Sequence, residues 1–101
     1  MKWVYVFVRT DLPLNDLAPQ LAHACLEAGR QFQPTSTSVV IVGVKNTKKL
    51  IEAADLLDRN KINYYLWEEP EWGYGYTSMA TEPLDEDKKN LFKSFKTLKS
   101  C

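Results

Sequence analysis

A glutamine and the only histidine of the chain stand three residues apart in a segment with helical periodicity. Gln20 and His23 would therefore be neighbours on one side of that helix. An imidazole titrates near neutral pH, and an amide both donates and accepts hydrogen bonds, so the pair suits ligand binding or proton transfer. A histidine that merely lies at the margin of the helix is the alternative.

A second group of residues capable of chemistry lies between positions 68 and 76. Glu68, Glu69 and Glu71 place three carboxylates within four residues, and one of them could act as a base or orient the histidine. Aromatic residues then alternate with glycines, and their ring faces could stack on a base or an adenosine ring. These aromatic residues are Trp72, Tyr74 and Tyr76. A solvated acidic loop, with its aromatic rings packed onto the domain, is the alternative.

Two continuous apolar runs, residues 3–8 and 38–44, predict central strands covered on both faces of a sheet. Between them, an apolar stripe with a period near 3.6 predicts a helix from a cap at Asp16 to about Gln31. Arg9 and Asp11 follow the first strand directly. Because ligand sites in α/β sheets form at the carboxyl ends of strands, both are candidate ligand-binding residues.

The second half of the chain predicts a helix, a hairpin and a final helix. The second helix begins at a cap on Asn46 or Thr47 and extends to about residue 60. Strands at 62–68 and 77–81 are separated by a short loop, which favours a hairpin and hence a mixed sheet. The final helix begins at Asp85, and its apolar stripe is Leu91, Phe92, Phe95 and Leu98. Its lysines at 88, 89, 93, 96 and 99 indicate a solvated face rather than a nucleic-acid surface.

Composition narrows the class of protein. The 101 residues are 45% hydrophobic, which fits one globular α/β domain over the whole chain. Thirteen basic residues balance 13 acidic ones, so no global positive field attracts nucleic acid. Cys25 and Cys101 lack metal-ligand spacing and predict free thiols in a reducing compartment. No cofactor motif, signal peptide or membrane-length apolar run is present, so we expect a soluble cytoplasmic protein without cofactor or membrane partner.

Two stretches near the start of the chain resemble the signature of type II peptidyl-tRNA hydrolases. Residues 8–12 read V-R-T-D-L, and residues 18–24 read A-P-Q-L-A-H-A. The family signature is a strand ending in V-R-x-D-L, followed by a helix that carries A-A-Q-x-x-H-A. Later segments follow the family order up to about Leu84, including the acidic strand end at residues 68–70 and T-S-M-A at 77–80. The chain looks closest to small bacterial and phage relatives of that family.

The resemblance implies a three-layer α/β/α sandwich on a four-stranded mixed sheet, with the order β-α-β-α-β-β-α. It also implies hydrolysis of the ester between a peptide and the 3′ adenosine of tRNA, without a metal. By position, His23 would be the polar catalytic group, Thr77 the hydroxyl, and Glu68 or Glu69 the carboxylate where the family has aspartate. Gln20 would help to position the substrate.

Two other functions stay open. The connector over residues 12–16 has no lysine and is shorter than in the family, so the same fold could bind a nucleotide or RNA end without cleaving it. A phage protein that sequesters a signalling nucleotide would be one example, and Arg9 is the candidate replacement cation. A structural homodimer without a ligand is the third possibility, and the presence of Gln20, His23 and Thr77 argues against it.

Overall fold

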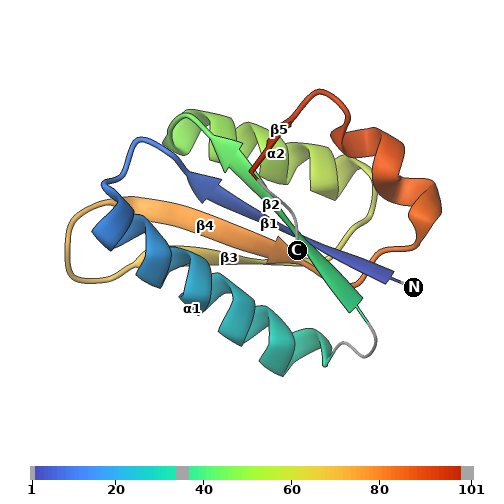
Figure 1. Ribbon diagram of the computed structural model, residues 1–101, viewed down its shortest axis with the longest axis horizontal. Coiled ribbons are helices and arrows are strands. Elements are labelled where there is room, and N and C mark those ends of the chain that lie inside the picture. The colour runs from blue at the N-terminus through green and yellow to red at the C-terminus, as the bar shows by residue number, and fades with distance from the viewer. Residues whose placement is uncertain (1, 34–36, 99–101) are drawn as a thin grey trace.

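The computed structural model contains one five-stranded mixed sheet with helices on both faces, and it describes residues 2–33 and 37–98 (Figure 1). The strands are arranged in the order β3-β4-β1-β2-β5. The elements in chain order are β1 (Lys2–Arg9), α1 (Leu14–Phe32), β2 (Thr37–Val44), α2 (Thr47–Arg59), β3 (Tyr64–Glu69), β4 (Gly75–Thr81), the 3₁₀ helix η1 (Glu86–Phe92) and β5 (Lys96–Thr97).

The apolar run at residues 3–8 forms the middle strand of the sheet, as its pattern predicts. β1 pairs in parallel with β2 and antiparallel with β4. Val4 and Val6 pack on the α1 side, whereas Tyr5 and Phe7 pack on the opposite side, so β1 is covered on both faces. In β2 the burial alternates, and only one face is fully covered, because this strand lies beside the short β5 near the edge of the sheet. The expectation of two fully covered strands is therefore correct for β1 alone.

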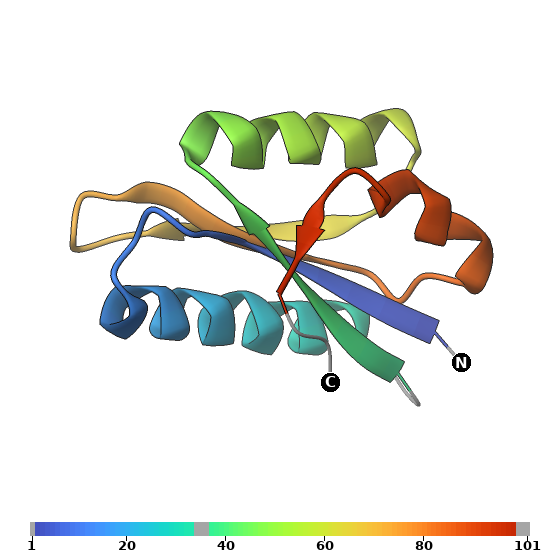
Figure 2. The ribbon, with the colours of Figure 1, turned by 45° about the horizontal axis from the view of Figure 1, so that its top comes forward.

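The two long helices lie on opposite faces of the sheet (Figure 2). On α1 the small residues Ala24 and Ala28 pack against Val4, Val6 and Ala80. On α2 the buried stripe is Leu50, Ala53, Ala54 and Leu57, which joins the aromatic side of the core. Consequently the connection after β1 leads to one face of the sheet, and the connection after its parallel neighbour β2 leads to the other face.

The two helix starts differ in how closely they follow the sequence prediction. The side chain of Asn46 accepts a hydrogen bond from the Lys49 amide at 2.9 Å, so the predicted cap of α2 is confirmed. The predicted cap of α1 at Asp16 is wrong, because that helix begins at Leu14 and Asp16 lies in its first turn. The amides of Asp16 and Leu17 both donate to the Pro13 carbonyl, at 2.9 and 2.8 Å.

The C-terminal region differs most from the prediction. Instead of a helix through Leu98, a 3₁₀ helix ends at Phe92 and the chain turns back to pair with the outer edge of β2. The Phe92 ring stacks on Tyr5 with centroids 4.1 Å apart, and Phe95 meets Phe7 edge-on at 5.4 Å. Burial of these rings and the hydrogen bond from the Leu98 amide to Ile41 outweigh helix propensity. The sheet therefore has five strands rather than four, and the element order gains a final strand.

Of the two predicted free thiols, Cys25 is free and half-buried in α1, and burial raises the pKa of its thiol. Cys101 and Lys99 lie outside the described residues. Among the helices within residues 2–33 and 37–98, none combines the length and the apolar character that crossing a lipid bilayer requires.

Candidate functional site

A β-bulge in β4 aims two consecutive side chains at α1. Trp67 pairs with Ser78 and Glu68 pairs with Tyr76, so Thr77 is an extra residue on β4. Side chains of a regular strand alternate between faces, and an inserted residue breaks that alternation. Both hydroxyls therefore reach Gln20 on α1: Thr77 donates to its side-chain oxygen at 2.7 Å, and Ser78 donates to its backbone carbonyl at 2.8 Å.

These contacts determine which way the Gln20 amide points. The indole N–H of Trp67, which can only donate, also bonds the Gln20 Oε1 atom, at 2.9 Å. Gln20 is 2% exposed and Thr77 is fully buried. No described residue accepts a bond from the Gln20 Nε2 atom, and no fully buried side-chain nitrogen or oxygen in the described part of the chain lacks a partner. The NH₂ group is thus a preoriented donor that reaches accessible space.

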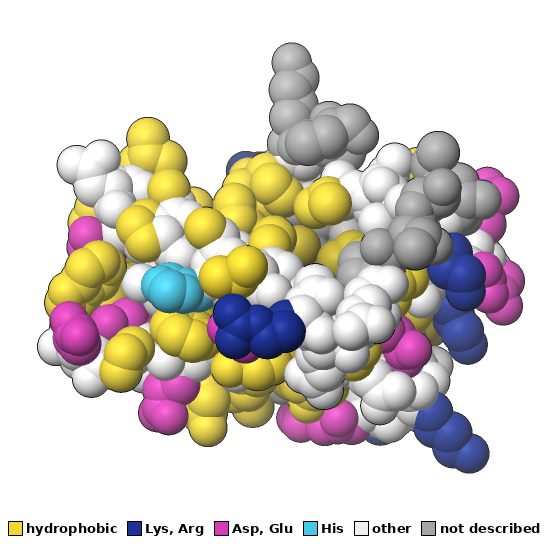
Figure 3. Space-filling model, turned by 90° about the horizontal axis from the view of Figure 1, so that it is seen from below, with side chains coloured by type: hydrophobic (Ala, Val, Ile, Leu, Met, Phe, Trp, Pro, Cys, Tyr) yellow, Lys and Arg dark blue, Asp and Glu magenta, His cyan; other side chains and the backbone are white. Residues whose placement is uncertain are grey.

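His23 lies beside that donor. Its ring stacks on Trp67, with centroids 4.4 Å apart and planes at 9°. Stacking fixes the plane of an exposed imidazole while its nitrogen-bearing edge stays available. Figure 3 shows the face of the molecule with the histidine at the surface, among hydrophobic side chains and near acidic ones.

Gln20 and His23 line a cleft of about 260 Å³ between the first half of α1 and the loop after β3. Glu69, Glu71 and Trp72 form the loop side of this cleft, and the remaining lining residues are Pro19, Trp67 and Pro70. Two carboxylates and no lysine or arginine are thus among its lining residues. The arrangement favours a neutral or cationic group inside the cleft.

Glu69 organises the loop. Its carboxylate is 8% exposed and accepts hydrogen bonds from the backbone amides of Glu71 and Trp72. Gly73 and Gly75 complete the turn at φ 76° and 73°, a region that favours glycine. Glu69 therefore shapes the cleft through the loop, with its carboxylate already occupied. Glu68 is exposed on the other side of the strand end and does not line the cleft.

Arg9 ties the start of α1 to the same loop. Its Nε and Nη2 atoms donate to the two carboxylate oxygens of Asp11, both at 2.9 Å, and its Nη1 atom donates to the carbonyls of Tyr74 and Tyr76. Hydrogen bonding to Arg9 is the main reason that the pKa of Asp11 is lowered. The Tyr74 hydroxyl donates to Asp16 at 2.6 Å, and this bond raises the pKa of Tyr74. Four of its five N–H groups are thus engaged and the residue is 8% exposed, so Arg9 holds the scaffold together.

The structure therefore brings only some of the predicted residues to one place. Gln20, His23, Glu69 and Trp72 line the cleft, and Thr77 lies directly behind Gln20. The others surround the cleft or face away from it, and these are Arg9, Asp11, Glu68, Tyr74 and Tyr76.

Sequence reasoning missed Trp67 and Ser78 as site residues. Both residues lie in strands and look like ordinary sheet residues in the sequence. The bulge that brings them against Gln20 has no recognisable sequence pattern here. One cue was available: the indole N–H of a tryptophan in a buried strand needs a hydrogen-bond acceptor, which marks Trp67 as a residue with a polar partner.

Within the described ranges, no group of three or more His, Cys, Asp or Glu side chains is arranged to hold a metal ion. Comparisons with protein-family models and with curated proteins found no match to this chain. Inferences about function therefore rest on the site itself and on the resemblance of its sequence motifs.

Proposed function

We propose that the cleft binds the 3′ end of a peptidyl-tRNA and hydrolyses the ester that joins the peptide to the terminal adenosine. The observation that carries the proposal is the Gln20 amide, whose oxygen is held by Trp67 and Thr77 so that its NH₂ group faces outward beside His23. A donor oriented in advance supports an acyl oxygen on which negative charge develops. The Q-x-x-H motif on the helix is similar to that of type II peptidyl-tRNA hydrolases.

In this mechanism each group has one role. The Gln20 Nε2 atom donates to the ester carbonyl oxygen, and the imidazole of His23 accepts a proton from a water molecule as that water attacks the carbonyl carbon. When the tetrahedral intermediate collapses, the bond to the ribose oxygen breaks and the imidazolium returns the proton to that oxygen. Trp67 and Thr77 act as positioning residues through Gln20.

The composition of the cleft supports a neutral ligand segment rather than phosphate. Its charged lining residues are Glu69 and Glu71, which repel phosphate groups but admit an adenosine or an ester. The Trp72 side chain is 52% exposed at the rim and offers a face on which adenine can stack.

A second candidate is binding of the same RNA end or nucleotide without turnover. Two observations favour it. The guanidinium of Arg9 is occupied by Asp11 and two carbonyls, so it does not supply the cation that the lysine-free connector lacks. The carboxylate of Glu69 is likewise occupied by backbone amides.

Hydrolysis of a purified N-acetylated aminoacyl-tRNA distinguishes the two candidates. If the cleft is catalytic, wild-type protein releases the acyl group over multiple turnovers, and His23→Ala lowers the rate by about 10²-fold or more with a much smaller effect on binding. Gln31→Ala is the matched control, because Gln31 is exposed on the same helix away from the cleft. Catalysis is refuted if wild type shows no turnover, and the role of His23 is refuted if His23→Ala retains full activity. Mass spectrometry of nucleotide released from denatured wild-type protein then tests the binding alternative.

A further inference from the structure

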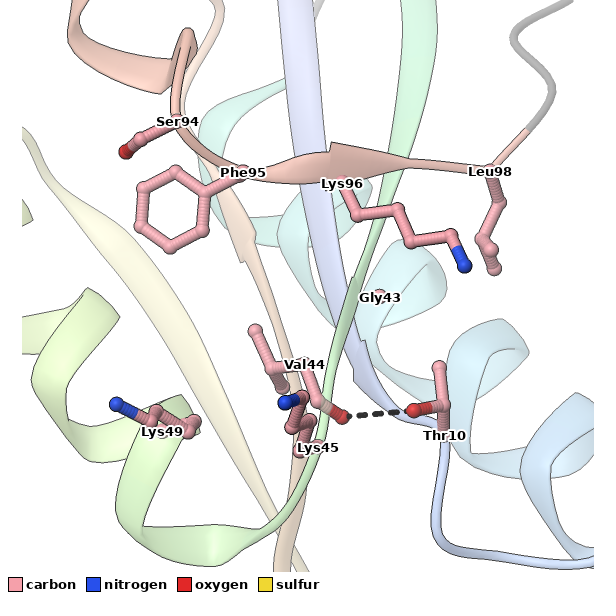
Figure 4. Close-up of a pocket in the computed structure, with 9 residues that line it drawn as sticks. All are labelled: Thr10, Gly43, Val44, Lys45, Lys49, Ser94, Phe95, Lys96 and Leu98. Atoms are coloured by element: carbon pink, nitrogen blue, oxygen red, sulfur yellow. Dashed lines mark hydrogen bonds between the residues drawn. The ribbon is translucent and has the colours of Figure 1, made fainter.

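A separate cavity of about 410 Å³ opens at the carboxyl ends of β1 and β2 (Figure 4). Thr10 follows β1, Val44 ends β2 and Lys45 follows it, and the remaining walls come from Gly43, from α2 and from the segment around β5. None of the residues assigned to ester hydrolysis lines this cavity. A ligand bound here would not compete with the proposed reaction for side chains.

The position of this cavity in the fold is one where α/β proteins bind ligands. β1 and β2 are parallel neighbours, and the chain leaves them for α1 and α2 on opposite faces. Where neighbouring connections diverge in this way, a crevice forms at the carboxyl ends of the strands. The Thr10 amide and hydroxyl both donate to the Val44 carbonyl, at 2.8 and 3.2 Å, and hold the two strand ends together at its floor.

The charge of this cavity is opposite to that of the cleft at α1. Three lysines line it: Lys45 follows β2, Lys49 belongs to α2 and Lys96 to β5, and no aspartate or glutamate is among the described residues that line it. The ammonium of Lys49 is shared with Glu52 at 3.3 Å. Lys45 and Lys96 have no acidic partner within the described part of the chain. In a chain of zero net charge, the described residues thus concentrate positive charge at this concave surface.

Apolar side chains lie on both sides of β2 at this cavity (Figure 4). Leu98 lies on the same side as Lys96, over the bare backbone of Gly43, whereas Phe95 points to the side of α2. A side chain at position 43 would meet the methyl group of Thr10, since a Cβ placed there lies 2.8 Å from the Thr10 Cγ2 atom. The cavity thus combines an apolar surface, which suits a ring, with two ammonium groups that have no acidic partner among the described residues, which suit an anion.

We propose that this cavity binds an organic phosphate, with the phosphate between Lys45 and Lys96 and its attached ring against Leu98. A free nucleotide and the backbone of an RNA strand both carry this chemistry. The proposal concerns binding and stands whether or not the cleft at α1 hydrolyses an ester.

The test is titration of the full chain with adenosine monophosphate, with adenosine, and with a short single-stranded RNA ending in CCA. The double variant Lys45→Gln/Lys96→Gln is compared with Lys48→Gln, which removes an exposed lysine in the first turn of α2, close to Lys45 in the sequence, that does not line the cavity. We expect the double variant to weaken binding of the monophosphate at least about tenfold, with adenosine binding unchanged and Lys48→Gln close to wild type. Circular dichroism verifies that each variant is folded.

The salt dependence of RNA binding identifies the source of the phosphate. If the RNA backbone occupies the cavity, the slope of log K against log salt falls by about 0.7 in the double variant, since the one phosphate between the two lysines contributes about 0.7 when it belongs to a single strand. If only the monophosphate is affected, the cavity takes a free nucleotide. The proposal is overturned if wild type binds neither phosphate ligand at millimolar concentration, or if Lys48→Gln weakens binding as much as the double variant.

Discussion

Replacement of Gln20 by methionine tests whether its side-chain oxygen organises the site. Methionine keeps the length and unbranched shape of glutamine but cannot accept the bonds from Thr77 and Trp67. Because Thr77 is fully buried, its unpaired hydroxyl should cost about 2 kcal/mol, and the half-buried indole N–H about 1 kcal/mol more. The extra apolar burial of methionine offsets about 1 kcal/mol. The net loss in the free energy of unfolding should therefore be about 2 kcal/mol.

This loss is measurable by equilibrium unfolding of the two proteins. Urea denaturation should give the free energy directly, and the melting temperature should fall by about 8–16 °C for a domain of this size. Gln31→Met makes the same chemical change at an exposed position of α1 and should shift the stability by less than about 0.5 kcal/mol.

A second substitution separates lost hydrogen bonds from altered packing. Thr77→Val removes the hydroxyl while keeping a β-branched side chain, and in wild type it should cost about 1 kcal/mol. In the Gln20→Met background it should instead recover about 1–2 kcal/mol, because no buried hydroxyl is then left without a partner. The reasoning is refuted if Gln20→Met is as stable as Gln31→Met, or if the effects of the two substitutions simply add.

Three further substitutions test other parts of the structure. Val6→Asp places a charge in the fully buried centre of β1, and we expect no cooperative unfolding transition by circular dichroism; a folded variant would contradict the buried position of this strand. Asp11 has a pKa below its ordinary value of 3.8, so its stabilising effect is complete above that pH and is lost as the pH falls toward the lowered value. The difference in free energy of unfolding between wild type and Asp11→Asn should therefore be constant near neutral pH and smaller at about pH 3. If urea denaturation at that pH gives the same difference as at neutral pH, the result would count against the Arg9 pairing. Trp72→Ala should weaken adenosine binding by about 1–3 kcal/mol with little change in melting temperature, and equal affinity in a titration would remove Trp72 from the site.

Several features of the fold follow from short stretches of sequence. The uninterrupted apolar run of residues 3–8 predicts a strand buried on both faces, and β1 is that strand. The cap at Asn46 and the stripe of α2 involve residues within a few positions of each other, and both are confirmed. The placement of Gln20 and His23 on one side of a helix likewise depends only on helical periodicity, and both residues line one cleft. Such features depend on local propensity and periodicity, which the sequence alone expresses.

The arrangement of the site was decided by contacts between distant segments. Gln20 meets Trp67, Thr77 and Ser78 across separations of 47, 57 and 58 residues, and the bulge that directs both hydroxyls to α1 exists only once β3 and β4 are paired. The final segment forms a 3₁₀ helix and a fifth strand for two reasons. Its phenylalanine rings pack against Tyr5 and Phe7, and its backbone pairs with the outer edge of β2. Neither partner lies near enough in the sequence to appear in a local pattern. The sequence therefore determined which residues were available for chemistry, and tertiary packing decided which of them meet, because burial and strand pairing outweigh local preference wherever the two compete.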